Sequence, residues 1–198
     1  MINKDQILVV PVNYTSYIKN GFTGATSLST KNSYSLFDSV GVYEPRYKID
    51  NNICFTKISV IMIFYYDNKF LVKELYDLSK RPCLELGINS YVYPYSGNHL
   101  ALLNQMNHVL QHELNIAPKT IKINFIGYIK DYTNESVKST LGNIYHIKTT
   151  CPIILSNNSS IFQYKWYTLR ELVDRYTKAT SWSKKLIDNL LIETIKLC

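Results

Sequence analysis

Residues 99–116 read HLALLNQMNHVLQHELNI and show the clearest helical spacing in the chain. Its apolar residues recur at steps of three and four and would form one stripe along a helix: Leu103, Met106, Leu110 and Leu114. The polar residues Gln105, His108 and His112 would lie on the opposite side. The pattern predicts an amphipathic helix that packs its apolar stripe into the protein core.

Strands are predicted on the N-terminal side of this helix. Residues 58–66 and 70–76 are two β-rich apolar runs around the polar turn 67–69, a pattern typical of a hairpin. Residues 84–93 read as extended, and Gly97-Asn98 then offers a break and a helix cap. Nearer the N-terminus we expect a strand at 6–12, followed over residues 13–39 by a long irregular segment or a short flap.

More strands and two helices are predicted on the C-terminal side. The expected strands are 121–130, 143–149 and 162–167. Thr168 and Glu171 have the spacing of a capping box before a helix at 169–176. Thr180 or Ser181 can cap a final helix that runs to about residue 196.

The composition is that of a globular domain. The chain has 198 residues, of which 46% are hydrophobic and 19% charged, and this length is sufficient to bury a core without a metal or disulfides. Together with the order of the predicted elements, this indicates an α+β fold in a single domain, residues 1–198. No apolar run reaches the ~20 residues that span a bilayer, and 7–12 is too short for a signal peptide, so we expect a cytoplasmic protein without membrane contact.

Residues 108–116 resemble a degenerate Nudix box, a motif that reads Arg-Glu-apolar-x-Glu-Glu-x-Gly-apolar in that family. Leu110 and Ile116 match its apolar positions, and Glu113 matches its last glutamate. The remaining motif positions are changed: His108 replaces the arginine, Val109 and His112 replace two glutamates, Asn115 replaces the glycine, Leu100 replaces an earlier glutamate and Pro94 replaces a loop glycine.

The surrounding sequence extends the resemblance. Residues 164–172 are similar to the tryptophan and Glu-Leu helix start that often close a Nudix domain, and 7–11, 125–129 and 181–183 are similar to parts of a divergent bacterial Nudix-like subgroup. The resemblance implies a mixed β-sheet sandwich with a central box helix and two C-terminal helices. It also implies an N-terminal extension at 1–57, a core at 58–172 and a closing helix at 173–198.

The missing carboxylates determine the expected function. Nudix hydrolases use several glutamates on the box helix to hold Mg²⁺ or Mn²⁺ against a diphosphate, whereas Glu113 is the only acidic residue between Leu86 and Lys130. The resemblance therefore implies a catalytically degenerate protein that retains a binding or interaction surface, with no cofactor expected. The alternative is a divergent hydrolase of nucleoside-diphosphate-linked substrates that uses Mg²⁺ or Mn²⁺ with Glu113 and Glu135 as catalytic residues.

The histidine pair allows a second kind of site. His108 and His112 are four residues apart, which places both imidazoles on one side of a helix with Glu113 beside them. These three residues could hold zinc or another transition metal. The competing interpretation is two solvated histidines, or two histidines in the wall of a cleft.

The charge balance favours an anionic partner. Lysine and arginine number 22 against 15 acidic residues, giving a net charge of +7, but the basic residues are scattered along the chain. We expect a nucleotide-like anion with Arg46, Lys73, His108 and His112 as the ligand-binding residues. The 17 tyrosines also leave open a protein-interaction role in which a protein is the partner, and nucleic acid is not excluded.

Overall fold

The computed structural model describes most of the chain, and its contacts divide it into two compact units. The described residues are 4–16, 18, 20–24, 37, 39–50, 52–76, 83–94, 100–117, 121–133, 139–153 and 162–197. The first unit comprises Met1–Ile61, Asn89–Thr120 and Phe125–Tyr145, and the second comprises Met62–Ile88, Ile121–Asn124 and His146–Cys198. The single domain over residues 1–198 stays a prediction.

The first unit is built around strands that the hydrophobic pattern largely predicts. Its neighbouring strands follow the order β4-β9-β8-β2, while β1 pairs with β3 and β4 and β7 pairs with β4. Its strands are β1 (Gln6–Pro11), β2 (Gly21–Gly24), β3 (Val42–Pro45), β4 (Phe55–Tyr66), β7 (Ile88–Tyr91), β8 (Lys122–Lys130) and β9 (Thr140–Lys148), and β4, β7, β8 and β9 also contribute residues to the second unit. The short helices η1 (Val12–Tyr14) and α2 (Arg46–Ile49) follow β1 and β3.

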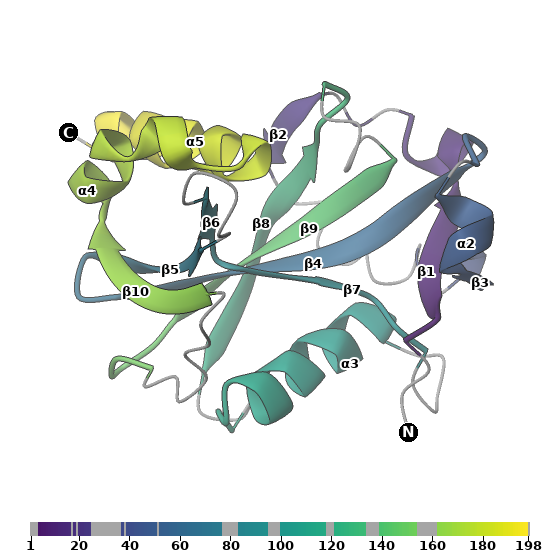
Figure 1. The fold of residues 1–198 in the computed structure, drawn as a ribbon, viewed down its shortest axis with the longest axis horizontal. Helices are drawn as coiled ribbons and strands as arrows, with labels where there is room; N and C mark the ends of the chain where they lie inside the picture. Colours follow the sequence, from purple (N-terminus) through teal and green to yellow (C-terminus); the bar gives the residue numbers. More distant parts are fainter. Residues whose placement is uncertain are drawn as a thin grey trace. The chain divides into compact units, whose positions relative to one another are not determined.

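The predicted helix is present but has two parts. It begins as α3 (Ala101–His108) and continues as the π-helical turn η2 (Val109–Glu113), in which Leu114 donates its backbone N–H to the Val109 carbonyl at 3.1 Å (Figure 1). Val109 and Leu110 are both fully buried, as helical spacing places them three and four residues after the buried Met106. The π turn that follows adds one residue to the helical repeat before Leu114.

The face that α3 buries differs in part from the prediction. Met106, Leu110 and Leu114 are buried as predicted, whereas Leu103 is only half-buried and Leu102 occupies the core. The prediction for Gln105 was wrong, because this residue is 1% exposed. Burial is tolerated because the Gln105 side chain accepts a hydrogen bond from the Tyr93 backbone N–H at 3.2 Å and donates one to Ser90 Oγ at 2.8 Å.

The second unit contains the predicted hairpin and the C-terminal helices. The strand order is β10-β5-β4, and β6 also pairs with β5. Its further elements are β5 (Lys69–Leu75), β6 (Cys83–Leu86), β10 (Phe162–Thr168), α4 (Leu169–Asp174), η4 (Tyr176–Lys178) and α5 (Ser181–Leu197). The green-to-yellow end of the ribbon in Figure 1 follows β10 into α4 and then α5, and α4 contacts β10 while α5 contacts β6.

Local sequence signals account for the turns and caps of the second unit. Asp67 and Asn68 have φ values of 46° and 59°, as a two-residue hairpin turn between β4 and β5 requires. Thr168 and Glu171 form the predicted capping box at the start of α4. Thr180 caps α5, because its Oγ1 accepts a hydrogen bond from the Ser183 N–H at 3.3 Å.

Among the described residues, the sequence did not predict the short helix η1 or the elements β2, β3 and α2. Strand β2 lies inside residues 13–39, where we expected an irregular segment, and much of that segment lies outside the described residues. The elements β2, β3 and α2 are four residues long, and β2 and β3 exist by pairing with distant strands, as in Gly24 opposite Gly127 and Tyr43 opposite Leu8. Among the described residues, no helix combines the length and the apolar character that crossing a membrane would need.

Candidate functional site

The end of the box helix retains its backbone geometry despite the changed residues. Asn115, which stands where the Nudix motif has glycine, has a φ of 53°. This left-handed conformation favours glycine, and asparagine is among the few other residues that adopt it readily. The next residue, Ile116, donates its N–H to the Leu110 carbonyl at 2.7 Å. The substitution is therefore compatible with the turn that ends the helix.

The two histidines of the box helix contact each other. The ring centroids of His108 and His112 are 4.7 Å apart, with His108 half-buried and His112 exposed. Burial lowers the pKa of His108, and the nearby positive charges of His112 and Lys4 lower it further. The imidazole of His108 is therefore held in its neutral form more strongly than an ordinary histidine.

The side chains of this helix do not fit the metal cluster of a Nudix hydrolase. Val109 is 0% exposed and has no ligand atom, so the residue that stands at one glutamate position of the motif lies in the core, while Glu113 is exposed. Within the described part of the chain, no three His, Cys, Asp or Glu side chains are grouped so that they could hold a metal ion. Mg²⁺ and Mn²⁺ prefer several oxygen ligands, and Glu135 lies outside the described residues. The metal site predicted at His108, His112 and Glu113 stays a prediction without support from this geometry.

Arg46, a predicted site residue, lies against the ring of Tyr91. The guanidinium carbon of Arg46, at the start of α2, is 5.3 Å from the centre of the Tyr91 ring. Burial raises the pKa of Tyr93, the charge of Arg46 opposes this rise, and Tyr91 and Glu113 add to it. We call Arg46, Tyr91 and Tyr93 the arginine–tyrosine cluster.

Core packing fixes the tyrosines of this cluster. Tyr91 and Tyr93 are partly buried against the apolar core of Ile7, Val9 and Ile49. Gln105 on α3 holds the backbone at Tyr93 through the hydrogen bond described above. The sequence signal was the alternation of tyrosines at 91, 93 and 95, which is equally typical of an ordinary strand.

Lys73, the remaining predicted ligand residue, belongs to the second unit. Its Nζ is 4.7 Å from the centre of the Phe162 ring and 4.0 Å from Glu85 Oε2. These contacts engage the ammonium group with a ring and a carboxylate of its own unit. Lys73 is therefore not part of the arginine–tyrosine cluster within the first unit.

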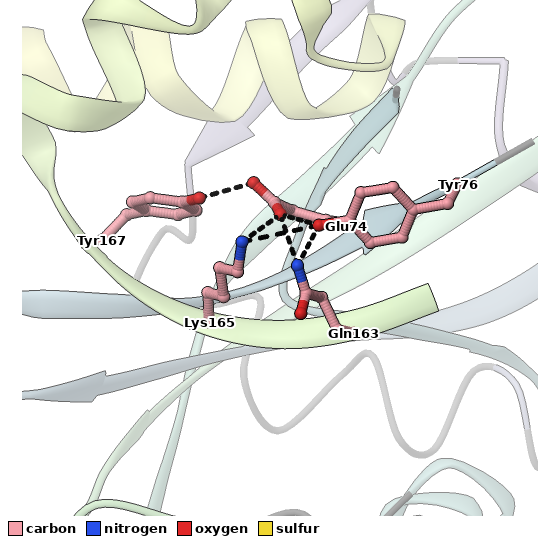
Figure 2. A network of polar contacts seen from close by, with 5 residues as sticks. All are labelled: Glu74, Tyr76, Gln163, Lys165 and Tyr167. Carbon is pink, nitrogen blue, oxygen red and sulfur yellow. Dashed lines mark hydrogen bonds and ion pairs between the residues drawn. The ribbon is translucent and has the colours of Figure 1, made fainter. Parts of the chain in front are cut away.

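A polar network that the sequence did not predict surrounds Glu74 in the second unit. Figure 2 shows side chains from β10 and the neighbouring Tyr76 converging on the Glu74 carboxylate. Lys165 Nζ is 2.8 Å from Oε2, Gln163 Nε2 is 3.2 Å from the same oxygen, and the Tyr76 and Tyr167 hydroxyls each donate at 2.5 Å.

Strand register explains this convergence. Glu74 lies opposite Gln163 in the antiparallel pair of β5 and β10, and residues 163, 165 and 167 share one face of β10. Burial opposes ionisation of Glu74, but the hydrogen bonds from Lys165, Tyr167, Tyr76 and Gln163 outweigh it and lower its pKa to about 2. The Glu74 carboxylate is therefore ionised over the physiological pH range.

Comparisons with known proteins identify the fold. No family model matches the sequence, and no curated protein matches it. The crystal structure of Tm1382, a protein classed with the Nudix hydrolases, matches 94% of this chain and 98% of its own, with a TM-score of 0.79 at 18% identity. The structure of DR0079 from Deinococcus radiodurans matches 76% of this chain and 92% of its own, with a TM-score of 0.53 at 14% identity. The predicted α+β architecture is confirmed, and this chain has a Nudix-like fold.

Proposed function

We propose that this protein binds a nucleotide-like anion in its first unit and lacks the standard metal-dependent diphosphate hydrolysis of Nudix enzymes. One observation carries the proposal: the box helix offers a single carboxylate, Glu113, while Val109 at a glutamate position of the motif is fully buried. The likeness to Tm1382 supports a nucleotide-like ligand, because that protein is classed with the Nudix hydrolases.

The proposed loss of hydrolysis follows from the electrostatics of the reaction. Negative charge that develops on a diphosphate during hydrolysis needs a positioned cation to stabilise it. A hard divalent cation needs several oxygen ligands, and neither a buried valine nor an imidazole is one. The chain therefore lacks most of the groups that would hold such a cation on the box helix.

The arginine–tyrosine cluster supports the binding half of the proposal. A guanidinium group pairs with phosphate oxygens through two parallel hydrogen bonds, and tyrosine rings provide surfaces on which a base can stack. Arg46 is exposed and lies against the Tyr91 ring, so its charge and an aromatic surface are adjacent. We assign Arg46 to the phosphate and the Tyr91 ring to the base or sugar, and we keep His108 and His112 as further ligand-binding candidates.

We expect no hydrolysis above background when the purified protein is given ADP-ribose, dinucleoside polyphosphates or nucleoside triphosphates with Mg²⁺ or Mn²⁺. Product formation measured by chromatography should equal that of a protein-free control, and Glu113→Gln should leave the result unchanged. Metal-dependent turnover that disappears in both Glu113→Gln and Glu135→Gln would establish the divergent-hydrolase alternative. Turnover that depends on His108 and His112 would indicate a histidine-held metal.

We expect Arg46→Gln to weaken nucleotide binding about ten- to a hundredfold, because a hydrogen bond to a charged group contributes about 1.5–3 kcal/mol. Calorimetric titration with ADP and ADP-ribose measures this change. The control is Lys48→Gln, which removes an exposed positive charge from the same helix. Equal weakening in both variants, or no nucleotide binding by the wild type, would contradict the proposal and favour the protein-interaction role.

A further inference from the structure

The second unit contains a pocket that the proposed function does not use. It has a volume of about 120 Å³ and is lined by Glu74, Tyr76, Cys83, Leu84, Arg175 and Lys178. Glu74 on β5 lies opposite Leu84 on β6 in the strand pairing. The Leu84 carbonyl accepts a hydrogen bond from the Thr180 N–H at 3.0 Å, which fixes the segment after α4 beside β6.

Among the described residues that line the pocket, Glu74 is the one carboxylate, and its charge is already compensated. Glu74 forms an ion pair with Lys165 at 2.8 Å, and Tyr76, Gln163 and Tyr167 donate further hydrogen bonds to it. Figure 2 shows these donors on both oxygens of the carboxylate. The negative charge of Glu74 is therefore balanced by Lys165 and does not cancel the other positive charges of the pocket.

The two cations of the lining have donors to offer. Arg175 lies 4.7 Å from the centre of the Tyr167 ring and donates from Nη1 to the Glu171 carbonyl at 3.3 Å, and a guanidinium group carries five N–H donors. Lys178 is exposed, and no hydrogen bond or ion pair joins it to another side chain among the described residues. The contact with the Tyr167 ring and the hydrogen bond to the Glu171 carbonyl restrict the Arg175 side chain and reduce the entropy that it would lose on binding.

Two nearby carboxylates have their main partners outside the pocket, although the charge of Arg175 adds to the Thr168 hydrogen bonds that lower the pKa of Glu171. Glu171 accepts hydrogen bonds from the Thr168 N–H and hydroxyl at 2.8 Å in the capping box of α4. Glu85 lies 4.0 Å from Lys73. Burial and the charge of Glu85 raise the pKa of the Cys83 thiol, so this group adds no negative charge to the pocket at neutral pH.

We propose that this pocket binds a single phosphate group through Arg175 and Lys178. The volume of about 120 Å³ is below the roughly 300–1,000 Å³ of pockets that hold drug-sized ligands, so it suits one such group rather than a whole nucleotide. Two positive charges match the charge of about −1.5 to −2 that a phosphate monoester carries at neutral pH. A carboxylate carries half that charge and should bind more weakly.

The test is a calorimetric titration of the full chain with inorganic phosphate, at an ionic strength held constant with sodium chloride. We expect saturable binding by the wild type, weakened about tenfold in Lys178→Gln and in Arg175→Gln. Lys148→Gln, which removes an exposed charge of the same unit outside the pocket, should bind as the wild type does. The thermal midpoint of each variant without phosphate verifies folding, and Lys178→Gln decides the result if Arg175→Gln is unstable.

Parallel titrations with sulfate and acetate distinguish the ligand classes. We expect sulfate to bind and acetate to bind more weakly. Absence of phosphate binding, tighter binding of acetate, or equal weakening in Lys148→Gln would overturn the proposal. Arg46→Gln should leave phosphate binding in this pocket unchanged. The phosphate proposal and the proposed nucleotide site in the first unit can therefore fail independently of each other.

Discussion

Replacing Leu110 with alanine is expected to lower the free energy of unfolding by about 2–5 kcal/mol. Leu110 is 0% exposed and lies in the π-helical turn that follows α3. Truncation to alanine removes buried methyl and methylene groups and leaves a cavity that the surrounding core fills only partly. Urea denaturation followed by circular dichroism measures the change.

Leu103→Ala on the same helix is the matched control. Leu103 is only half-buried, so the same truncation removes less buried surface and should cost clearly less. Equal losses at the two positions would show that the helix does not bury the face that carries Met106 and Leu110 in preference to Leu103. A loss at Leu110 within experimental error would lead to the same conclusion.

The elements that were predicted correctly have local signals. The turn at Asp67 and Asn68 depends on two adjacent residues that tolerate positive φ values, and the α4 cap depends on Thr168 and Glu171 three positions apart. Each signal lies within a few residues of the structure it specifies. Such features can be predicted from one sequence because the interacting groups are close along the chain.

The elements that were missed depend on distant partners. Strand β2 is a four-residue segment with glycine at both ends, and its pairing with β8 joins positions more than a hundred residues apart. The face of α3 was misjudged for a related reason. Leu102 and Leu103 are adjacent and both apolar, so periodicity alone could not decide between them, and the partners of Gln105 lie outside the helix.

The candidate sites also differ in how far they depend on local sequence and on contacts between distant residues. The resemblance of residues 108–116 to a Nudix box predicted the fold correctly, whereas the assignment of Arg46 to ligand binding stays a prediction. The Glu74 network could not be predicted, because Glu74 and Gln163 are 89 residues apart and meet only through the register of β5 and β10. No local pattern in the sequence marks Glu74 as different from other strand carboxylates.

This network leads to an expected acid sensitivity that Glu74→Gln should reduce. The folded-state pKa of Glu74 is about 2, below its usual 4.5, so the ionised carboxylate stabilises the fold above pH 4.5. That stabilisation is lost as the pH falls from 4.5 through about 2, where the folded protein also takes up the proton. This lowering of the pKa corresponds to about 3 kcal/mol of stabilisation. The Glu74 side chain is only 16% exposed, so solvent should screen only a small part of that stabilisation.

Glutamine keeps the size of the side chain but removes the charge that Lys165 pairs with at 2.8 Å. We therefore expect Glu74→Gln to lower the free energy of unfolding by about 3 kcal/mol at pH 7 and to differ less and less from the wild type as the pH falls toward 2. Urea denaturation at a series of pH values measures the difference. Glu85→Gln on the neighbouring strand is the control, because its carboxylate lies 4.0 Å from Lys73 and such surface pairs contribute about 0–1 kcal/mol. A difference between Glu74→Gln and the wild type that stays constant from pH 7 to pH 2 would mean that shape, and not the ionised carboxylate, accounts for the stability of the network.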